Sequence, residues 1–149
     1  MLPSRNAVFV DTSGWVEPVL RSSPNHAVMT QYAQTLHSDQ RRLVTTDDVL
    51  NEVVALLTTD SRGMPRPKLI QFIQQIRGNA GLQVVHVDEA IWQEAWAMLE
   101  QMSDKTWSLV DAASFVVMRH LGIVEAFTSD HHFTQAGFIR VPLPIRGLR

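Results

Sequence analysis

Four acidic residues, far apart in the sequence, are of a type and placement that suit a metal-dependent hydrolytic site: Asp11, Glu52, Asp111 and Asp130. Carboxylate oxygens are the ligands that hard divalent cations such as Mg²⁺ prefer. A bound cation lowers the pKa of a water molecule, orients it, and stabilises the leaving oxygen of a phosphodiester. If the four carboxylates converge, their repulsion raises the pKa of each until protons or cations bind. These residues therefore predict phosphodiester hydrolysis with Mg²⁺ or Mn²⁺ and without a side-chain nucleophile.

The two acids within helical segments stand beside apolar residues. Between Leu109 and Met118 the only polar residues are Asp111 and Ser114, so this segment is expected to be a helix buried on most sides. Glu52 adjoins the apolar positions of its own helical segment. A buried, unpaired carboxylate costs several kcal/mol or takes up a proton, and a divalent cation removes that penalty.

Each of the acids also has a purely structural interpretation. Asp11 is followed by Thr12 and suits the cap of a helix, and Ser108-x-x-Asp111 matches a capping box. Glu52 fits the rim of a helix, and Asp130 fits an ordinary turn. Independent caps and turns need not gather at one place, whereas a site for a hard metal requires several oxygen ligands together.

The elements that must position these acids follow from an alternation along the chain. Short apolar runs rich in β-forming residues predict strands at residues 6–10, 42–46, 82–87 and 126–129. Helical spacing predicts helices at residues 25–38, 47–59, 65–77, 88–102 and 108–121. This alternation indicates a mostly parallel sheet with helices on both faces, whose strand ends and following helix starts share one edge. Each of the four acids maps to that edge.

Composition limits the remaining possibilities. The 149 residues are 45% hydrophobic, which is enough for one core. The clearest linker is residues 61–67 (SRGMPRP), but the segments on either side of it are too short for two domains. Residues 1–149 are therefore expected to form a single domain. The absence of cysteine excludes disulfides, thiolate metal sites and a cysteine nucleophile. No apolar stretch approaches the length of a signal peptide or a membrane span, which indicates a cytoplasmic protein without a membrane partner.

Positive charge is concentrated in one segment, although the formal net charge is −2. No acid lies between Asp60 and Asp88, while the basic residues of that interval are Arg62, Arg66, Lys68 and Arg77. Such a segment is able to hold RNA phosphates, or it is simply the solvated face of a helix.

Four motifs resemble those of PIN-domain nucleases of the VapC toxin type: VDTSGW at residues 10–15, the glutamate of TTDDVLNEV at 45–53, DKTWSLVDAASFVVM at 104–118, and FTSDHHFTQAGF at 127–138. The resemblance covers nearly the whole chain, and the last two motifs are the specific ones. It implies a three-layer α/β/α fold with a sheet of four to five strands. It also implies that Asp11, Glu52, Asp111 and Asp130 bind Mg²⁺ or Mn²⁺ and cut RNA.

The resemblance further implies supporting residues and partners. In this family a residue such as Thr12 or Ser13 often lies beside the metal, and an acid such as Asp104 sometimes contributes from outside. Proteins of this type are usually toxins inhibited by a small antitoxin protein, and they commonly form homodimers.

Three other residues near the acids have possible roles. His131 and His132 flank Asp130, but Mg²⁺ prefers oxygen ligands, so a role in shaping the loop is favoured for His132. Trp107 precedes Asp111 closely enough to stack on an RNA base, although packing is the more ordinary role.

Two other classes of function stay open at this point. One is a phosphatase or phosphotransferase with Asp11 as nucleophile, although such enzymes place a second acid two residues later, where this chain has Ser13. The other is a non-catalytic module of the same fold that binds nucleic acid or a protein partner.

Overall fold

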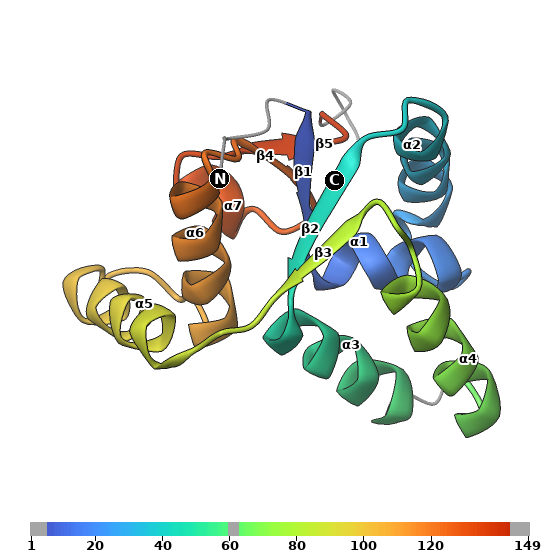
Figure 1. Ribbon diagram of the computed structural model, residues 1–149, viewed down its shortest axis with the longest axis horizontal. Coiled ribbons are helices and arrows are strands. Elements are labelled where there is room, and N and C mark those ends of the chain that lie inside the picture. Colours follow the sequence, from blue (N-terminus) through green and yellow to red (C-terminus); the bar gives the residue numbers. More distant parts are fainter. Residues whose placement is uncertain (1–5, 60–62, 144–149) are drawn as a thin grey trace.

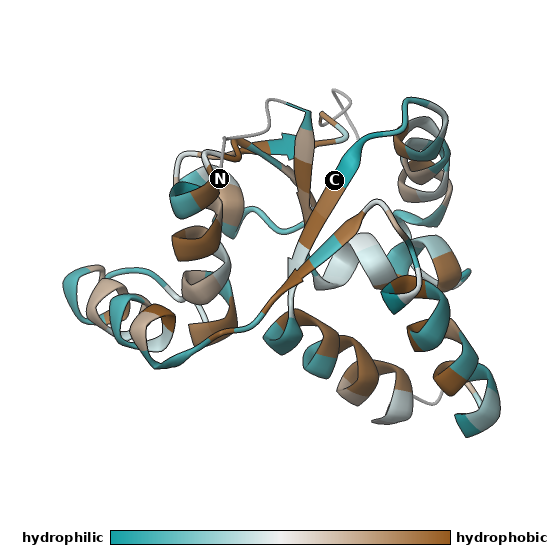
Figure 2. Ribbon diagram, viewed as in Figure 1, coloured by the Kyte–Doolittle hydropathy of each residue, from teal (hydrophilic) through white to brown (hydrophobic). Residues whose placement is uncertain are grey.

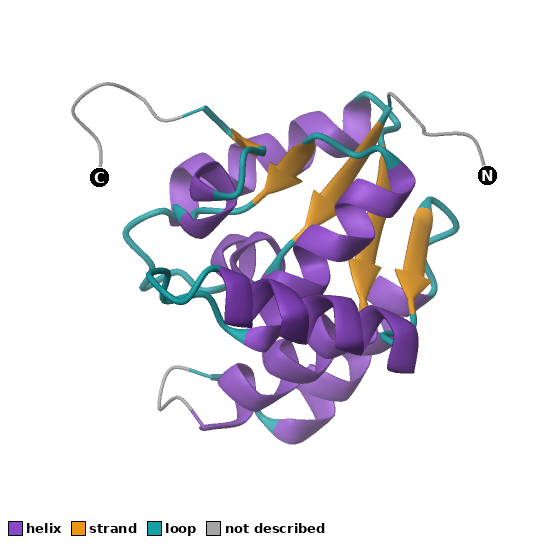
Figure 3. Ribbon diagram, turned by 90° about the vertical axis from the view of Figure 1, so that its left-hand side faces the viewer, coloured by secondary structure: helices purple, strands orange, loops and turns teal. Residues whose placement is uncertain are grey.

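One parallel sheet organises the computed structural model, which describes residues 6–59 and 63–143. Its strands are β1 (Ala7–Val10), β2 (Arg42–Thr46), β3 (Leu82–Val85), β4 (Glu125–Phe127) and β5 (Ile139–Val141). They lie in the order β3-β2-β1-β4-β5 with every pairing parallel, so the arrows point one way in Figure 3. The prediction of a mostly parallel sheet of four to five strands is confirmed.

Helices cover both faces of this sheet. They are α1 (Thr12–Val16), the 3₁₀ helix η1 (Glu17–Val19), α2 (His26–Ser38), α3 (Asp47–Thr59), α4 (Arg66–Arg77), α5 (Glu89–Gln101), α6 (Leu109–Leu121) and α7 (His132–Gln135). In Figure 1, α5, α6 and α7 lie on one side of the sheet, α1, α2 and α4 lie on the other, and α3 follows the carboxyl end of β2. The predicted three layers are therefore present. Within residues 6–59 and 63–143, no helix has the length and apolar character needed to cross a bilayer.

The structure differs from the sequence-based boundaries mainly in short elements. Strand β5 and the helices α1, η1 and α7 have at most five residues each, too few to show a periodicity. Strand β3 ends at Val85 rather than at residue 87 because its one partner among the described strands, β2, ends at Thr46, which pairs with Val85. Residues 86–87 thus have no neighbouring strand to pair with.

The central strand β1 is buried on both faces, which fixes the backbone that leads to Asp11. Phe9 packs with Phe115 and Phe133 on the side of α6 and α7, whereas Val8 and Val10 pack on the side of α2. The rings of Phe115 and Phe133 meet edge to face with centroids 4.9 Å apart. Figure 2 accordingly shows hydrophobic colour along the strands in the middle of the molecule.

The order in which strands are added to the sheet reverses at β1. From β1 the chain winds outward through β2 to β3, then returns to place β4 on the opposite side of β1. In open parallel sheets, the crevice outside the carboxyl ends at such a switch in strand order is the usual place for a ligand. For this protein that crevice lies between the ends of β1 and β4.

Gly14 allows α1 to lie against the end of β4. A Cβ atom placed on Gly14 would come within 2.4 Å of the carbonyl oxygen of Phe127 and 2.9 Å of a side-chain methyl of Val10. Both neighbours belong to the sheet, so a larger residue has to push α1 away from it. The close approach therefore sets the position of Thr12 and Ser13, which lie in α1.

We predict that Gly14→Ala destabilises the protein by about 1–3 kcal/mol, because overpacking against rigid backbone outweighs the gain in helix propensity. Urea unfolding followed by circular dichroism measures this change. Gly81→Ala is the matched control, because its nearest contact is the Asn79 side chain at 3.3 Å. Equal stability of Gly14→Ala and the native protein would contradict the packing argument.

Candidate active site

Asp11 is a buried carboxylate at the carboxyl end of the central strand. It directly follows β1 and is 4% exposed. Its Oδ2 accepts a hydrogen bond of 3.0 Å from the hydroxyl of Thr128, which follows β4. Although Asp11 occupies the N-cap position of α1, its side chain bonds within that helix only to the adjacent amide of Thr12, among the described residues, and makes no capping hydrogen bond further into the helix. Capping therefore does not explain this aspartate.

Burial raises the pKa of Asp11 from 3.8 to about 7. The negative charges of Asp111 and Asp130 act in the same direction, whereas hydrogen bonds from the Thr12 amide and the Thr128 hydroxyl lower the pKa. Three of the four predicted acids thus lie within electrostatic reach of one another. No Lys or Arg side chain of the described residues forms an ion pair with Asp11. The negative charge of Asp11 itself is therefore left for a proton or an external cation to neutralise.

Asp111 has both a structural role and a place in this cluster. It lies in the first turn of α6, which is buried from Asp111 to Met118 as the sequence predicts. Asp111 and Ser108 form a capping box in which each side chain accepts a hydrogen bond of 3.0 Å from the other's backbone amide. The same Oδ2 atom lies 3.0 Å from Nδ1 of His132, on α7. The capping interpretation is correct, and the carboxylate nevertheless faces the loop that carries Asp130.

Asp130 lies in that loop, between β4 and α7. Its amide donates a 3.0 Å hydrogen bond to the Thr128 hydroxyl, and its Oδ1 accepts one of 2.9 Å from the amide of His132. Its Oδ2 lies 3.4 Å from Nδ1 of His132. The turn interpretation is therefore also correct, and the turn aims Asp130 at the same His132 ring that Asp111 contacts.

Glu52 reaches the site from α3 through a residue of α1. Its Oε1 accepts a hydrogen bond of 2.7 Å from the hydroxyl of Thr12, the residue after Asp11. The Ser13 hydroxyl lies 3.0 Å from that of Thr128 and accepts a 2.9 Å hydrogen bond from the amide of Ser129. Thr12 and Ser13, which were expected to support the site, therefore connect its acids to the surrounding backbone.

Asp104 stands apart from the other acids. It is exposed in the turn between α5 and α6 and pairs with its neighbour Lys105 at 3.1 Å. The hydrogen bond from Lys105 lowers the pKa of Asp104. No hydrogen bond links Asp104 to the other acids within the described part of the chain.

The histidines and the tryptophan near the acids mainly contact neighbouring side chains. His131, His132 and Asp130 present potential metal-ligating atoms within 4.8 Å of one another, but Nδ1 of His132 already contacts Asp111. Trp107 is buried, and its indole donates a 3.0 Å hydrogen bond to Gln135, so this ring packs in the core and is not positioned to stack on a base. The sequence did not single out Thr128, and its only signal was a position two residues before Asp130.

The predicted basic residues that the structure describes all lie on one helix. Arg66, Lys68 and Arg77 lie on α4, next to α3, and their side chains are exposed. Arg66 and Arg77 line a shallow groove of about 540 Å³ along α4. Arg62 lies outside the described residues.

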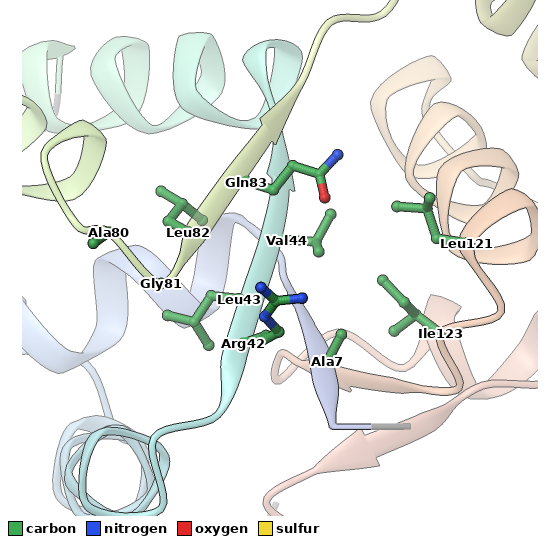
Figure 4. Close-up of a pocket in the computed structure, with 10 residues that line it drawn as sticks. All are labelled: Ala7, Arg42, Leu43, Val44, Ala80, Gly81, Leu82, Gln83, Leu121 and Ile123. Carbon is green, nitrogen blue, oxygen red and sulfur yellow. The ribbon is translucent and has the colours of Figure 1, made fainter. Parts of the chain in front are cut away.

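A separate hollow lies at the opposite edge of the sheet. It has a volume of about 280 Å³ and is lined by Ala7, Arg42 and Leu82, each the first residue of its strand. In Figure 4 it lies between the strands and the side chains of Leu121 and Ile123. Because no carboxylate lines it, this hollow is distinct from the acidic edge.

The sequence matches the PIN domain family model over residues 8–139. The chain therefore belongs to the PIN domain family.

The most informative relatives are endonucleases. The 23S rRNA-specific endonuclease VapC20 of Mycobacterium tuberculosis is 33% identical over 135 residues in both strains CDC 1551 / Oshkosh and H37Rv, which spans 90% of this chain and 97% of the relative. The crystal structure of VapC20, described as a Sarcin-Ricin loop cleaving toxin, superposes with a TM-score of 0.76 and 28% identity, covering 89% of this chain and 96% of that one. These matches confirm the predicted VapC-type endoribonuclease class.

A more distant structure shares the fold alone. FitAcB from Neisseria gonorrhoeae superposes with a TM-score of 0.61 at 14% identity, covering 89% of this chain and 95% of that chain. The three-layer arrangement thus persists where the sequences have largely diverged.

The raised pKa of Asp11 predicts how stability depends on pH in the metal-free protein. Because the folded pKa of about 7 exceeds the ordinary 3.8, the folded state keeps a proton that the unfolded state loses. This contribution is complete below pH 4 and is lost as the pH rises to about 7, by up to about 4 kcal/mol. In the presence of a chelator, the stability of Asp11→Asn should therefore fall less over this rise in pH than the stability of the native protein.

Melting temperatures measured between pH 4 and pH 8 check this expectation. Asp104→Asn is the control, because Asp104 is exposed and its pKa is lowered rather than raised. Parallel pH curves for the native protein and Asp11→Asn would show that Asp11 is not buried in the way described.

Proposed function

We propose that this protein is a metal-dependent endoribonuclease that hydrolyses ribosomal RNA, and that Asp11, Glu52, Asp111 and Asp130 hold its Mg²⁺ or Mn²⁺. The observation that carries this proposal is the buried carboxylate of Asp11, which faces the charges of Asp111 and Asp130 without a cationic partner among the described residues. Burying negative charge in this way is unfavourable unless a cation joins it.

The donor set fits a hard cation. Glu52 uses Oε1 and Asp111 uses Oδ2 in the hydrogen bonds of the described residues, which leaves the second oxygen of each carboxylate available. Oxygen ligands on several elements suit Mg²⁺ and Mn²⁺ better than softer metals. The bound ion would supply an activated water and stabilise the leaving oxygen.

The residues of the chain itself hold the acids in place. The Thr128 hydroxyl orients Asp11, the Thr12 hydroxyl orients Glu52, and the ring of His132 orients Asp111. These contacts fix the direction of each carboxylate before a cation arrives, which reduces the reorganisation that binding requires.

The substrate and its binding surface are proposed from the relatives and from charge. VapC20 is named for its specificity for 23S rRNA, and we propose ribosomal RNA for this chain as well. For the RNA-binding surface we propose the basic residues of the predicted segment, of which Arg66 and Arg77 share one exposed face of α4; the others are Lys68 and Arg62. A ribosomal substrate places the activity in the cytoplasm.

The proposed partners are a small antitoxin and a second copy of the chain. The solved relative is described as a toxin, which supports an inhibitor protein for this one. Exposed aromatic side chains on α5 support a protein interface, since Trp92 and Trp96 stack at the surface with centroids 5.4 Å apart. We propose that residues 1–149 act as a single nuclease domain within such a homodimer.

A nucleophilic role of Asp11 has less support. A phosphatase that used Asp11 as its nucleophile would have a second acid two residues later, where this chain has Ser13.

Incubation of the purified protein with total RNA and Mn²⁺, followed by mapping of the cut ends, tests the proposed activity. We expect cleavage that requires the metal and falls at least ~100-fold in Asp11→Asn and Asp111→Asn, because each substitution removes a carboxylate from the ion. Asp104→Asn should cleave like the native protein. Equal cleavage by all four proteins, or cleavage in excess chelator, would refute the site.

If the variants bind RNA but none of the proteins, native included, cleaves it, the chain is a binding module of the same fold. Substituting Arg66, Lys68 and Arg77 by Gln then tests whether α4 belongs to the RNA-binding surface. We expect weaker RNA binding and a shallower dependence of binding on salt, because each phosphate contact contributes about one unit of slope. An unchanged slope would remove α4 from the RNA-binding surface.

A further inference from the structure

Glu17 is a further buried carboxylate close to the candidate active site, and no pattern in the sequence singles it out. It begins η1 and is 9% exposed. It forms no ion pair among the described residues. Each of its two oxygens instead accepts a hydrogen bond from a serine hydroxyl, Oε2 from Ser23 at 2.6 Å and Oε1 from Ser129.

Ser129 is held on three sides by these and other contacts. Its amide donates to the Ser13 hydroxyl at 2.9 Å, its own hydroxyl donates to Glu17, and its carbonyl accepts a 2.8 Å hydrogen bond from Arg140. The hydroxyl bond joins residues 112 positions apart in the sequence. All three polar groups of this one residue are therefore used to fix the loop after β4.

The same loop carries two of the groups that surround the proposed metal. Thr128 precedes Ser129, and its hydroxyl donates a hydrogen bond to Asp11. Asp130 follows Ser129, and its amide donates a hydrogen bond to the hydroxyl of Thr128. The loop has no regular secondary structure of its own between β4 and α7, so its position depends on such contacts. Moving Ser129 would change the separation of Asp11 and Asp130.

We infer that Glu17 is a positioning residue of the proposed metal site, acting through its hydrogen bond to Ser129 to hold Asp130 at the right place relative to Asp11. This inference rests on the proposed function. A carboxylate at Glu17 suits the task because it has two oxygens, so that one accepts from Ser129 while the other accepts from Ser23.

The size of the effect follows from the way outer residues act in metal sites. Removing a partner that orients a ligand weakens metal binding by about 10–100-fold. Glu17 acts one residue away from Asp130, so we expect about a tenfold loss of Mg²⁺ affinity, at the lower end of that range. Ser129→Ala removes the same hydrogen bond from the other side and should have the same effect.

Titration of Mg²⁺ and Mn²⁺ against the melting temperature of the full chain, without RNA, measures metal affinity independently of activity. The variants are Glu17→Ala, Glu17→Gln, Ser129→Ala and the double variant Glu17→Ala/Ser129→Ala. Ser23→Ala is the matched control, because it removes the other hydrogen bond of Glu17 and leaves the one to Ser129 intact.

The inference expects the midpoint of the metal titration to rise about tenfold in Glu17→Ala and Ser129→Ala. The double variant should show no further rise, because both changes remove one bond. Glu17→Gln should restore most of the affinity, since its amide oxygen still accepts from a hydroxyl, and Ser23→Ala should bind metal like the native protein.

Two results would overturn the inference, and only one of them would also overturn the proposed function. If Glu17→Ala or Ser129→Ala melts at a lower temperature with an unchanged metal midpoint, Glu17 is a structural residue only and the proposed metal site stands. If the native protein shows no dependence on Mg²⁺ or Mn²⁺, the proposed function itself fails and this inference fails with it. Should Glu17→Ala not fold, Ser129→Ala decides between these results.

Discussion

The structure around the acidic edge depends on one unfavourable interaction, the burial of negative charge at the switch in strand order between β1 and β4. Burial, together with the repulsion of Asp111 and Asp130, raises the pKa of Asp11 to about 7. An arrangement selected only for stability would place an apolar residue or a cation there. Its retention in a chain of the PIN domain family is consistent with a site built to attract a cation.

The surrounding hydroxyl groups orient Asp11 and Glu52 without neutralising them. Hydroxyls of Thr12 and Thr128 donate to Glu52 and Asp11. A lysine or arginine in the same places would satisfy the carboxylates and also cancel their charge, which would weaken binding of a divalent ion. A hydroxyl fixes the direction of a carboxylate and leaves its negative charge almost unchanged. Within the described residues, His132 is the one aromatic ring that approaches two of the four acids, Asp111 and Asp130.

Much of the fold and of the candidate site could be predicted from the sequence, because both depend on patterns in single segments. The apolar run before Asp11 and the nearly apolar helix around Asp111 identify buried elements by themselves. Strand β5 is too short to show a pattern, and Glu17 has none, since its partner Ser129 lies 112 residues away. Contacts of this kind become visible only when the sheet brings the loops together.

Asp111 shows why the structural and chemical interpretations of an acid need not compete. Its capping box with Ser108 places the carboxylate at the start of α6, where the helix dipole favours negative charge. The same position is the carboxyl edge of the sheet, because helices in such folds begin where strands end. Capping therefore offsets part of the cost of burying Asp111, and the charge that it stabilises stays available to a cation. A capping carboxylate at this edge therefore stabilises the metal-free protein and is also suited to act as a metal ligand.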